Sequence, residues 1–310
     1  MRKTGSVSKA LDSSRSAPGS NDTVRSVVDE LAGTLERGGR DDSLSTARDI
    51  VAALLHVSRY WSALAGDVLL QAQIADAARV AAQRVVAGAP FAYAVGSAQF
   101  RSLTLNVDER VLIPRPETEV LVEEILTRFR AAAPGAGDWG VAVDIGTGSG
   151  AIALSLAVEG RFSRVVGTDT SLDALAVART NAGIIGAALR CPVEFRSGSL
   201  LAPVRDIKAR LLVSNPPYIA YDEAHDLPPS VRSWEPPSAL LTGSNGLAIT
   251  AAIVQKGKSL LDPGGALALE VDERRASLVA ELVMSTGGYR DVSVVLDLTG
   301  RERFVFASRA

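Results

Sequence analysis

The 310-residue chain has few of the side chains that form disulfides and bind metals. It contains one cysteine, Cys191, and two histidines, His56 and His225. A single cysteine excludes a disulfide within the chain and fits a reducing compartment, so a cytoplasmic location is expected. A dedicated zinc site draws on several Cys and His ligands. No metal cofactor is therefore expected.

Excess positive charge and long apolar runs are also lacking. The formal net charge is −2 at pH 7 and no Lys/Arg cluster stands out, whereas nucleic-acid binders attract phosphates with a clustered positive surface. Direct nucleic-acid binding is therefore not expected. No run of about 18 apolar residues occurs, so no membrane span is predicted. The first 20 residues are rich in Ser, Lys and Arg without the apolar centre of a signal peptide, and residues 1–20 are predicted to be disordered.

Hydrophobic residues make up 47% of the chain, enough for a substantial core. Over residues 21–93 they recur at helical spacing, which predicts a small domain of three to five helices. Over 97–113 apolar and polar residues alternate instead. This alternation predicts a β-hairpin linker at 94–113, with its turn near Asp108-Glu109-Arg110.

Strand and helix patterns alternate from residue 141 onward. The candidate strands are 141–145, 164–168, 193–196, 211–214, 266–271, 292–296 and 303–308. Such alternation indicates a mostly parallel sheet covered by helices on both faces. The sequence therefore predicts an α/β, Rossmann-like domain at 114–310, preceded by the small all-helical domain.

A glycine-rich turn follows the first of these strands, in VAVDIGTGSG (141–150). Glycines let a ligand approach the backbone, and the N-terminus of the next helix offers free N–H groups. The spacing GxGxG, preceded by Asp144, differs from the GxGxxG of dinucleotide-binding loops. Asp144 could attract the ammonium of a methionine moiety, and Asp169, at the end of the next strand, could accept two ribose hydroxyls. Together they favour S-adenosylmethionine (AdoMet) over NAD or over a turn without a ligand.

A second motif, LLVSNPPYIA (211–220), ends a core strand on Asn215, Pro216, Pro217 and Tyr218. The side-chain carbonyl of Asn215 and the backbone carbonyl of Pro216 are two acceptors that could hold both hydrogens of an –NH2 group. The Tyr218 ring could line one side of the group being methylated. Holding the nitrogen in line with a methyl–sulfur bond is catalysis by positioning. We therefore predict an N-methyltransferase with Asn215, Pro216 and Tyr218 as catalytic residues; the alternative is a turn that ends a strand.

NPPY after DIGTGSG, with FRSLTLNVDERVLIPRPETEVLVE before both, closely resembles the release-factor glutamine N5-methyltransferases. The resemblance runs from about Val24 to the end of the chain, and the PRPETE stretch is more specific than either loop alone. It implies a helical N-terminal domain before a Rossmann-type catalytic domain. It also implies methylation of the glutamine amide in the Gly-Gly-Gln motif of a peptide chain release factor, the expected protein partner.

The resemblance also implies which residues form the site. The residues expected to bind the glutamine or line its channel are Asn215, Pro216, Pro217, Tyr218, Phe100, Pro114 and Arg115. Those expected to bind the cofactor are Asp144, Gly146, Thr147, Gly148, Ser149, Gly150, Asp169, Thr170, Ser199, Leu200 and Asn215.

Three segments depart from the family's pattern. Ser199 stands where the family usually has an aspartate that contacts adenine, TGSNGL (242–247) replaces GGxDGL, and EVDERR (270–275) replaces ExGxxQ. These departures leave open a specialised relative that N-methylates a small molecule or peptide. A nucleic-acid amino-methyltransferase is a further alternative, because such enzymes share the Asn-Pro-Pro-aromatic loop.

Overall fold

The structure of the chain, a computed structural model, describes residues 22–133, 135 and 137–310. These residues belong to two compact units, one ending at Ser97 and one beginning at Ala98. The predicted disorder of residues 1–20 lies outside the described residues.

The first unit is helical. Its elements are α2 (Val24–Arg37), α3 (Ser43–Leu54), α4 (Trp61–Leu64), α5 (Ala72–Val86) and α6 (Phe91–Val95). Helix α2 begins after Thr23, whose hydroxyl accepts a hydrogen bond from the Ser26 N–H at 3.1 Å and satisfies one free donor of the first turn. Apolar residues at helical spacing, such as Val27 and Leu31 of α2 and Ile50 of α3, are buried together in one core.

The hairpin is shorter than predicted. It consists of β1 (Ser97–Phe100) and β2 (Leu103–Asn106), and its turn lies at Arg101, which has a φ of 52°. The prediction of a turn near Asp108–Arg110 is therefore wrong. The apolar alternation extends beyond the hairpin, because Val107 and Val111 are buried although β2 ends at Asn106.

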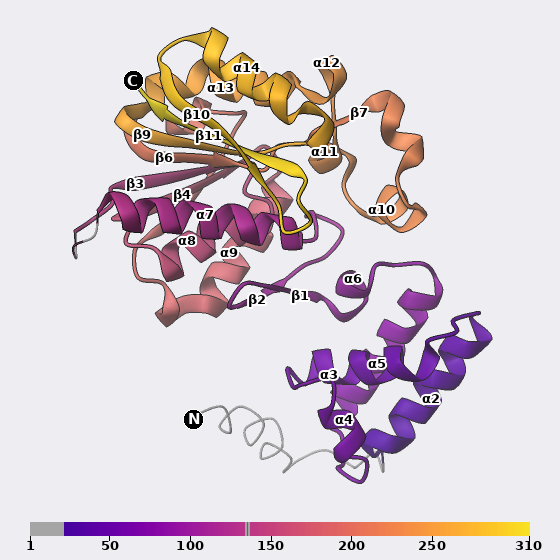
Figure 1. The fold of residues 1–310 in the computed structure, drawn as a ribbon. Coiled ribbons are helices and arrows are strands. Elements are labelled where there is room, and N and C mark those ends of the chain that lie inside the picture. The colour runs from indigo at the N-terminus through magenta and orange to yellow at the C-terminus, as the bar shows by residue number, and fades with distance from the viewer. Residues whose placement is uncertain (1–21, 134, 136) are drawn as a thin grey trace. The chain divides into compact units, whose positions relative to one another are not determined.

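The second unit contains a seven-stranded sheet of order β10-β11-β9-β6-β3-β4-β5 (Figure 1). The strands are β3 (Val141–Ile145), β4 (Arg164–Asp169), β5 (Val193–Ser197), β6 (Ala209–Ser214), β9 (Leu261–Glu270), β10 (Tyr289–Leu296) and β11 (Glu302–Arg309). Neighbours from β9 to β5 pair in parallel, and β11 and β10 add an antiparallel edge. The chain leaves β3 toward β4 on one side and returns to β6 on the other, so a crevice is expected where these strands end.

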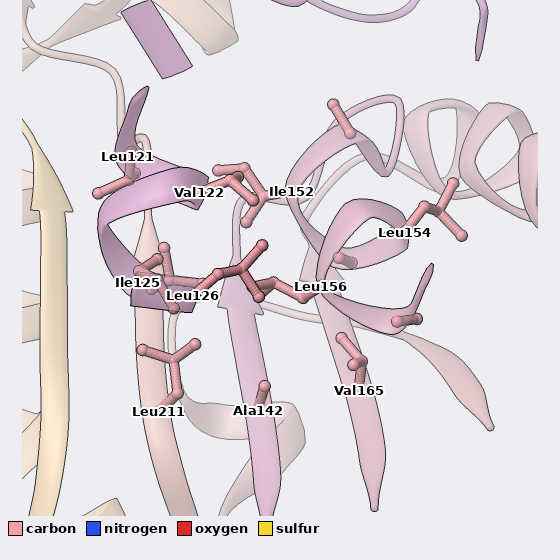
Figure 2. Packing of buried hydrophobic residues seen from close by; sticks show 14 of the residues in the cluster. Leu121, Val122, Ile125, Leu126, Ala142, Ile152, Leu154, Leu156, Val165 and Leu211 are labelled. Atoms are coloured by element: carbon pink, nitrogen blue, oxygen red, sulfur yellow. The ribbon is translucent and has the colours of Figure 1, made fainter. Parts of the chain in front are cut away.

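Helices cover both faces of this sheet. On one face lie α7 (Pro116–Ala132), α8 (Ala151–Glu159) and α9 (Leu172–Ile185), and on the other α13 (Ala248–Leu260) and α14 (Ala276–Thr286) (Figure 1). Figure 2 shows Leu126 of α7 beside Leu156 of α8 above the strands. The α/β fold predicted from the alternating pattern is confirmed. None of the described helices has the length and apolar character needed to cross a membrane.

Short elements fill the connections between these helices and strands. Between β6 and α13 lie β7 (Ile219–Ala220), η3 (Tyr221–Asp226), α10 (Pro229–Trp234), α11 (Pro237–Leu240), β8 (Leu241–Thr242) and α12 (Gly243–Gly246). Elsewhere lie η1 (Gly186–Ala188), η2 (Ala202–Val204) and η4 (Glu273–Arg275). Because β7 pairs in parallel with β8, the segment that follows NPPY is held next to the segment before α13.

Candidate active site

The glycine-rich loop after β3 is held by backbone hydrogen bonds. The N–H groups of Gly146 and Thr147 both donate to the Thr168 carbonyl at 2.8 Å, at the end of β4. Gly146 and Gly148 have φ values of 73° and 55°, which L side chains rarely adopt, and no atom lies within 4 Å of where a Cβ would stand. The loop therefore presents open backbone at the end of the sheet.

Asp169 is fixed beside this loop. One carboxylate oxygen accepts the Gly148 N–H at 3.0 Å and the other accepts the Ser171 N–H at 2.9 Å. The N-cap of α9 is Ser171, whose hydroxyl accepts from the Ala174 N–H at 3.1 Å. Asp169 therefore does not serve as the cap, and each of its oxygens keeps a lone pair for a further donor.

Asp144 lies beneath the loop. Its side chain is fully buried, and the Thr147 hydroxyl donates to Oδ2 at 2.7 Å. Burial raises the pKa of Asp144 to about 7, and the hydrogen bond from Thr147 acts in the opposite direction. Within the described part of the chain, Oδ1 is buried without a hydrogen-bond partner.

A first cavity, which we call the glycine-loop cavity, opens at the ends of β3 and β4. Of the residues predicted to bind the cofactor, those that line it are Gly146, Gly148, Asp169, Thr170, Ser199, Leu200 and Asn215. Asp144, Thr147, Ser149 and Gly150 do not line it. The Thr147 hydroxyl donates to Asp144 beneath the loop. Ser149 is buried, and Gly150 is the N-cap of α8. These residues therefore support the conformation of the loop without lining the cavity.

A second cavity, the NPPY cavity, lies along the 215–218 segment. Predicted substrate residues that line it are Arg115, Asn215, Pro216, Pro217 and Tyr218, joined by apolar side chains such as Leu227, Val231 and Leu240. Asn215 and Pro217 line both cavities. Leu112 and Ala239 also line both cavities, so the two spaces adjoin along these four residues, Asn215 among them.

Two of the predicted channel residues lie elsewhere. Phe100 is fully buried in the core cluster that includes residues of α7 and α8, and it lines neither cavity. Pro114 also lines neither cavity. Phe100 is thus a packing residue in this structure.

Arg115 pairs with Glu235, a residue that the sequence analysis did not predict to be in the site. Its guanidinium donates to Glu235 at 2.6 Å, and the Glu235 side chain is only 1% exposed. The Glu235 carboxylate also accepts the Ile113 N–H at 3.4 Å. This pairing fixes the charge of Arg115 at the wall of the NPPY cavity and joins the segment before α7 to the segment after α10.

Asn215 also has partners that periodicity did not reveal. Its Nδ2 donates to the Thr118 hydroxyl at 3.1 Å, and that hydroxyl donates to Glu270 at 2.7 Å. The only available signals were indirect, since Thr118 belongs to the PRPETE stretch and Glu270 opens a segment that departs from the family pattern. Tyr218 lies close by, and burial, followed by the charge of Glu270, raises the pKa of its hydroxyl to about 12.

Asn181 of α9 is a third unpredicted contributor. Its side chain donates to the Ser149 carbonyl at 2.9 Å and to the Asn106 carbonyl at 3.0 Å, and accepts the Asn106 N–H at 2.8 Å. This buried amide therefore joins the glycine loop to β2.

Two of the departing segments contact each other. The Arg275 guanidinium donates to Glu223 at 2.7 Å and to the side-chain oxygen of Asn245 at 3.4 Å. Glu223 also accepts the N–H of Ala220, two residues after NPPY, at 3.1 Å. Neither Asn245 nor Arg275 lines the glycine-loop cavity or the NPPY cavity, whereas Ser199 lines the glycine-loop cavity. Asn245 and Arg275 thus contact the segment that follows NPPY from outside the cavities, and Ser199 lines the site.

Comparison with known proteins identifies the class of this fold and site. A family model described as "Methyltransferase small domain" matches residues 117–227, which include both loops. The solved catalytic domain of hMettl16, in complex with the MAT2A 3′UTR hairpin 6, has the same fold, with a TM-score of 0.51 and 14% identity over 76% of this chain and 82% of that one. The chain is therefore a methyltransferase of the Rossmann-like class.

Relatives identify the family more narrowly. A release factor glutamine methyltransferase of Moorella thermoacetica is 42% identical over 229 residues, which are 74% of this chain and 78% of the relative. The Rhodopirellula baltica protein of the same name is 34% identical over 295 residues, 94% of this chain and 99% of the relative. The chain belongs to the release factor glutamine methyltransferase family.

Proposed function

We propose that the chain transfers a methyl group from AdoMet to the side-chain amide nitrogen of the glutamine in the Gly-Gly-Gln motif of a peptide chain release factor, in the cytoplasm. The observation that carries this proposal is the meeting of the two cavities at Asn215. A cofactor in the glycine-loop cavity and a side chain inserted beside Tyr218 would come together next to Asn215. The family to which the chain belongs supports the choice of substrate.

The glycine-loop cavity fits AdoMet better than a dinucleotide. Gly146 and Gly148 leave room for a ligand against the backbone, and Asp169 keeps lone pairs for ribose hydroxyls. Asp144 is buried beneath the loop and does not line the cavity, so its carboxylate would attract an ammonium from behind the loop or through water. Two carboxylates near the loop would repel a pyrophosphate. When bound, AdoMet would supply an electrophilic methyl group on a sulfonium.

The NPPY segment would position the amide nitrogen. The side-chain carbonyl of Asn215 and the backbone carbonyl of Pro216 would each accept one of its two hydrogens. This arrangement holds the nitrogen in line for transfer and favours tetrahedral geometry, which frees the lone pair from the amide. With a pKa of about 12, the Tyr218 hydroxyl stays neutral near pH 7, so Tyr218 contributes a wall. After the methyl has been transferred, the nitrogen would release one proton to water, and AdoMet would leave as the thioether S-adenosylhomocysteine.

The test is a transfer assay with AdoMet carrying a labelled methyl group. We expect a purified release factor to take up label on the Gly-Gly-Gln glutamine, located by peptide mass spectrometry. A release factor with this glutamine replaced by alanine is the matched control and should stay unlabelled. Label that enters a protein-free small-molecule extract instead of the release factor would contradict the proposal and favour the specialised relative.

Asp169→Ala should weaken AdoMet binding about 10- to 100-fold. The ribose hydroxyls would lose a charged acceptor, and hydrogen bonds to charged groups contribute about 1.5–3 kcal/mol. Calorimetry measures the change. Asp173→Ala is the control, because Asp173 is exposed in the first turn of α9 and lines neither cavity. Equal affinity in the two variants would remove the assignment of the ribose to Asp169.

A further inference from the structure

Asn215 is the first member of a buried chain of hydrogen bonds that ends on a carboxylate. Its Nδ2 donates to Thr118 Oγ1 at 3.1 Å, and Thr118 Oγ1 donates to Glu270 Oε2 at 2.7 Å. Thr118 is 4% exposed and Glu270 is 1% exposed, so water does not compete for these bonds. The three residues come from the end of β6, the first turn of α7 and the end of β9.

The direction of each bond follows from the charge of Glu270. An ionised carboxylate can only accept, so it takes the single proton of the Thr118 hydroxyl. The hydroxyl oxygen is then free to accept, and it accepts from the –NH2 end of Asn215. The amide oxygen of Asn215 must therefore be the end left for a ligand.

Protonation of Glu270 permits the opposite arrangement. A carboxylic acid can donate to Thr118 Oγ1, and the Thr118 hydroxyl then turns its proton toward Asn215. The amide oxygen of Asn215 then accepts a hydrogen bond from the Thr118 hydroxyl, and the –NH2 group of Asn215 points toward the ligand. A substrate –NH2 group would then face a donor instead of an acceptor.

We propose that Thr118 and Glu270 are positioning residues, and that ionised Glu270, acting through Thr118, turns the oxygen of Asn215 toward the substrate nitrogen. As a mechanism of turnover this inference rests on the proposed function. The hydrogen-bond chain itself exists without a substrate, which allows a test that does not depend on one.

Few charged or titratable groups act on Glu270. Burial is the largest influence and raises its pKa to about 7. The hydrogen bond from Thr118 and the positive charge of Arg303 on β11 lower it, and the negative charge of Glu117 on α7 raises it. A hydrogen bond from the Asn215 side chain also lowers it, more weakly than these three. Tyr218 also lies near Glu270 and is neutral in this range. A change of charge near pH 7 in this cluster is therefore a change at Glu270.

The consequence is an acid limb in the rate of transfer. Below about pH 7 Glu270 takes up a proton, and kcat at saturating AdoMet should fall toward tenfold per pH unit. An amide substrate does not titrate in this range, so the limb belongs to the enzyme. Thr118→Val should reduce the limb and lower kcat about tenfold at pH 8, because the main link that orients the Asn215 amide is lost. Thr118→Ser should restore the limb and most of the rate.

Variants of carboxylates separate Glu270 from other sources of the limb. Glu270→Gln should remove the limb, and Glu281→Gln, on the exposed face of α14, should keep it. Asp144→Asn is needed as well, because the pKa of Asp144 is also about 7. The limb should persist in Asp144→Asn with saturating AdoMet. If Asp144→Asn loses the limb while Thr118→Val keeps it, the inference is wrong.

A measurement without substrate decides the inference independently of the proposed function. In protein labelled with ¹⁵N-asparagine, the side-chain resonances of Asn215 are identified by their absence in Asn215→Ala. We expect them to shift with a midpoint near pH 7 in the wild type, to stay constant in Glu270→Gln and to shift less in Thr118→Val. If the Asn215 side-chain resonances of the wild type do not shift with pH, the inference is wrong. Failure of the release factor to accept methyl, with the shift present, overturns only the proposed function.

Discussion

Asn215→Ala is expected to lower kcat on the release factor by about 10²–10³-fold at saturating AdoMet. The variant removes one of the two acceptors for the substrate –NH2 group and leaves the nitrogen free to turn out of line. Loss of one oriented hydrogen bond in a dry site commonly costs a factor of this size, and each factor of ten corresponds to about 1.4 kcal/mol of barrier. Single-turnover rates measured with preformed enzyme–AdoMet complex report the change directly.

Because Asn215 lines both cavities, AdoMet affinity must be measured in the same variant. Tyr218 provides the graded comparison. Tyr218→Phe keeps the ring and should cost little, whereas Tyr218→Ala removes the wall of the NPPY cavity and should cost more. If Asn215→Ala turns over at the wild-type rate with saturating cofactor, the NPPY segment is only a turn that ends β6.

The sheet could be predicted from the sequence because its central strands are buried on both faces. Runs such as 141–145 and 211–214 are almost wholly apolar and short, a pattern typical of parallel strands between two helical layers. The polar residues that follow these runs mark the edge where ligands bind in such sheets. The glycine loop and the NPPY segment follow β3 and β6 at this edge of the sheet.

The hairpin turn and Phe100 could not be placed by the same reasoning. Alternation reports which side chains are buried, and Val107 and Val111 are buried in a segment that is no longer a strand. Phe100 is buried too, but only the packed structure shows that it faces the core instead of a channel. Burial and lining of a site produce the same apolar pattern.

Polar networks were harder still to predict. Thr118 and Glu270 are 152 positions apart, and Arg115 and Glu235 are 120 positions apart. No spacing rule connects such pairs, because each depends on which strands and helices become neighbours. A threonine in a first turn or a glutamate at a strand end also occurs with purely structural roles, so neither sequence position alone indicated a link to Asn215.

The structure also gives a physical reason for two of the three departures from the family pattern. Arg275 needs an acceptor, and it finds the Glu223 carboxylate and the Asn245 side-chain oxygen. The substitutions in both departing segments therefore involve the same contact, which lies next to the NPPY segment. Ser199 is different, because it lines the glycine-loop cavity and no compensating contact explains it.

Gly246→Ala, in the departing TGSNGL segment, should lower kcat/KM for the release factor by about 10²-fold. Gly246 has a φ of 79°, and a Cβ there would stand 2.3 Å from the Tyr218 carbonyl oxygen. That neighbour is backbone, so it cannot rotate away and the Tyr218 segment must move. A misplacement of about 1 Å at a catalytic group can cost a factor of this size. Steady-state kinetics with varied release factor measure the loss.

Gly243→Ala is the matched control, because nothing lies within 4 Å of its Cβ position. The same added methyl group in the same short segment should leave turnover unchanged. The left-handed backbone at position 246 should also cost about 1–2 kcal/mol of stability, so the melting temperature of Gly246→Ala should fall by a few degrees while AdoMet still binds. Wild-type kinetics in Gly246→Ala would show that the NPPY segment tolerates movement at Tyr218. Fixed positioning of the Tyr218 backbone by Gly246 would then not explain the activity of the enzyme.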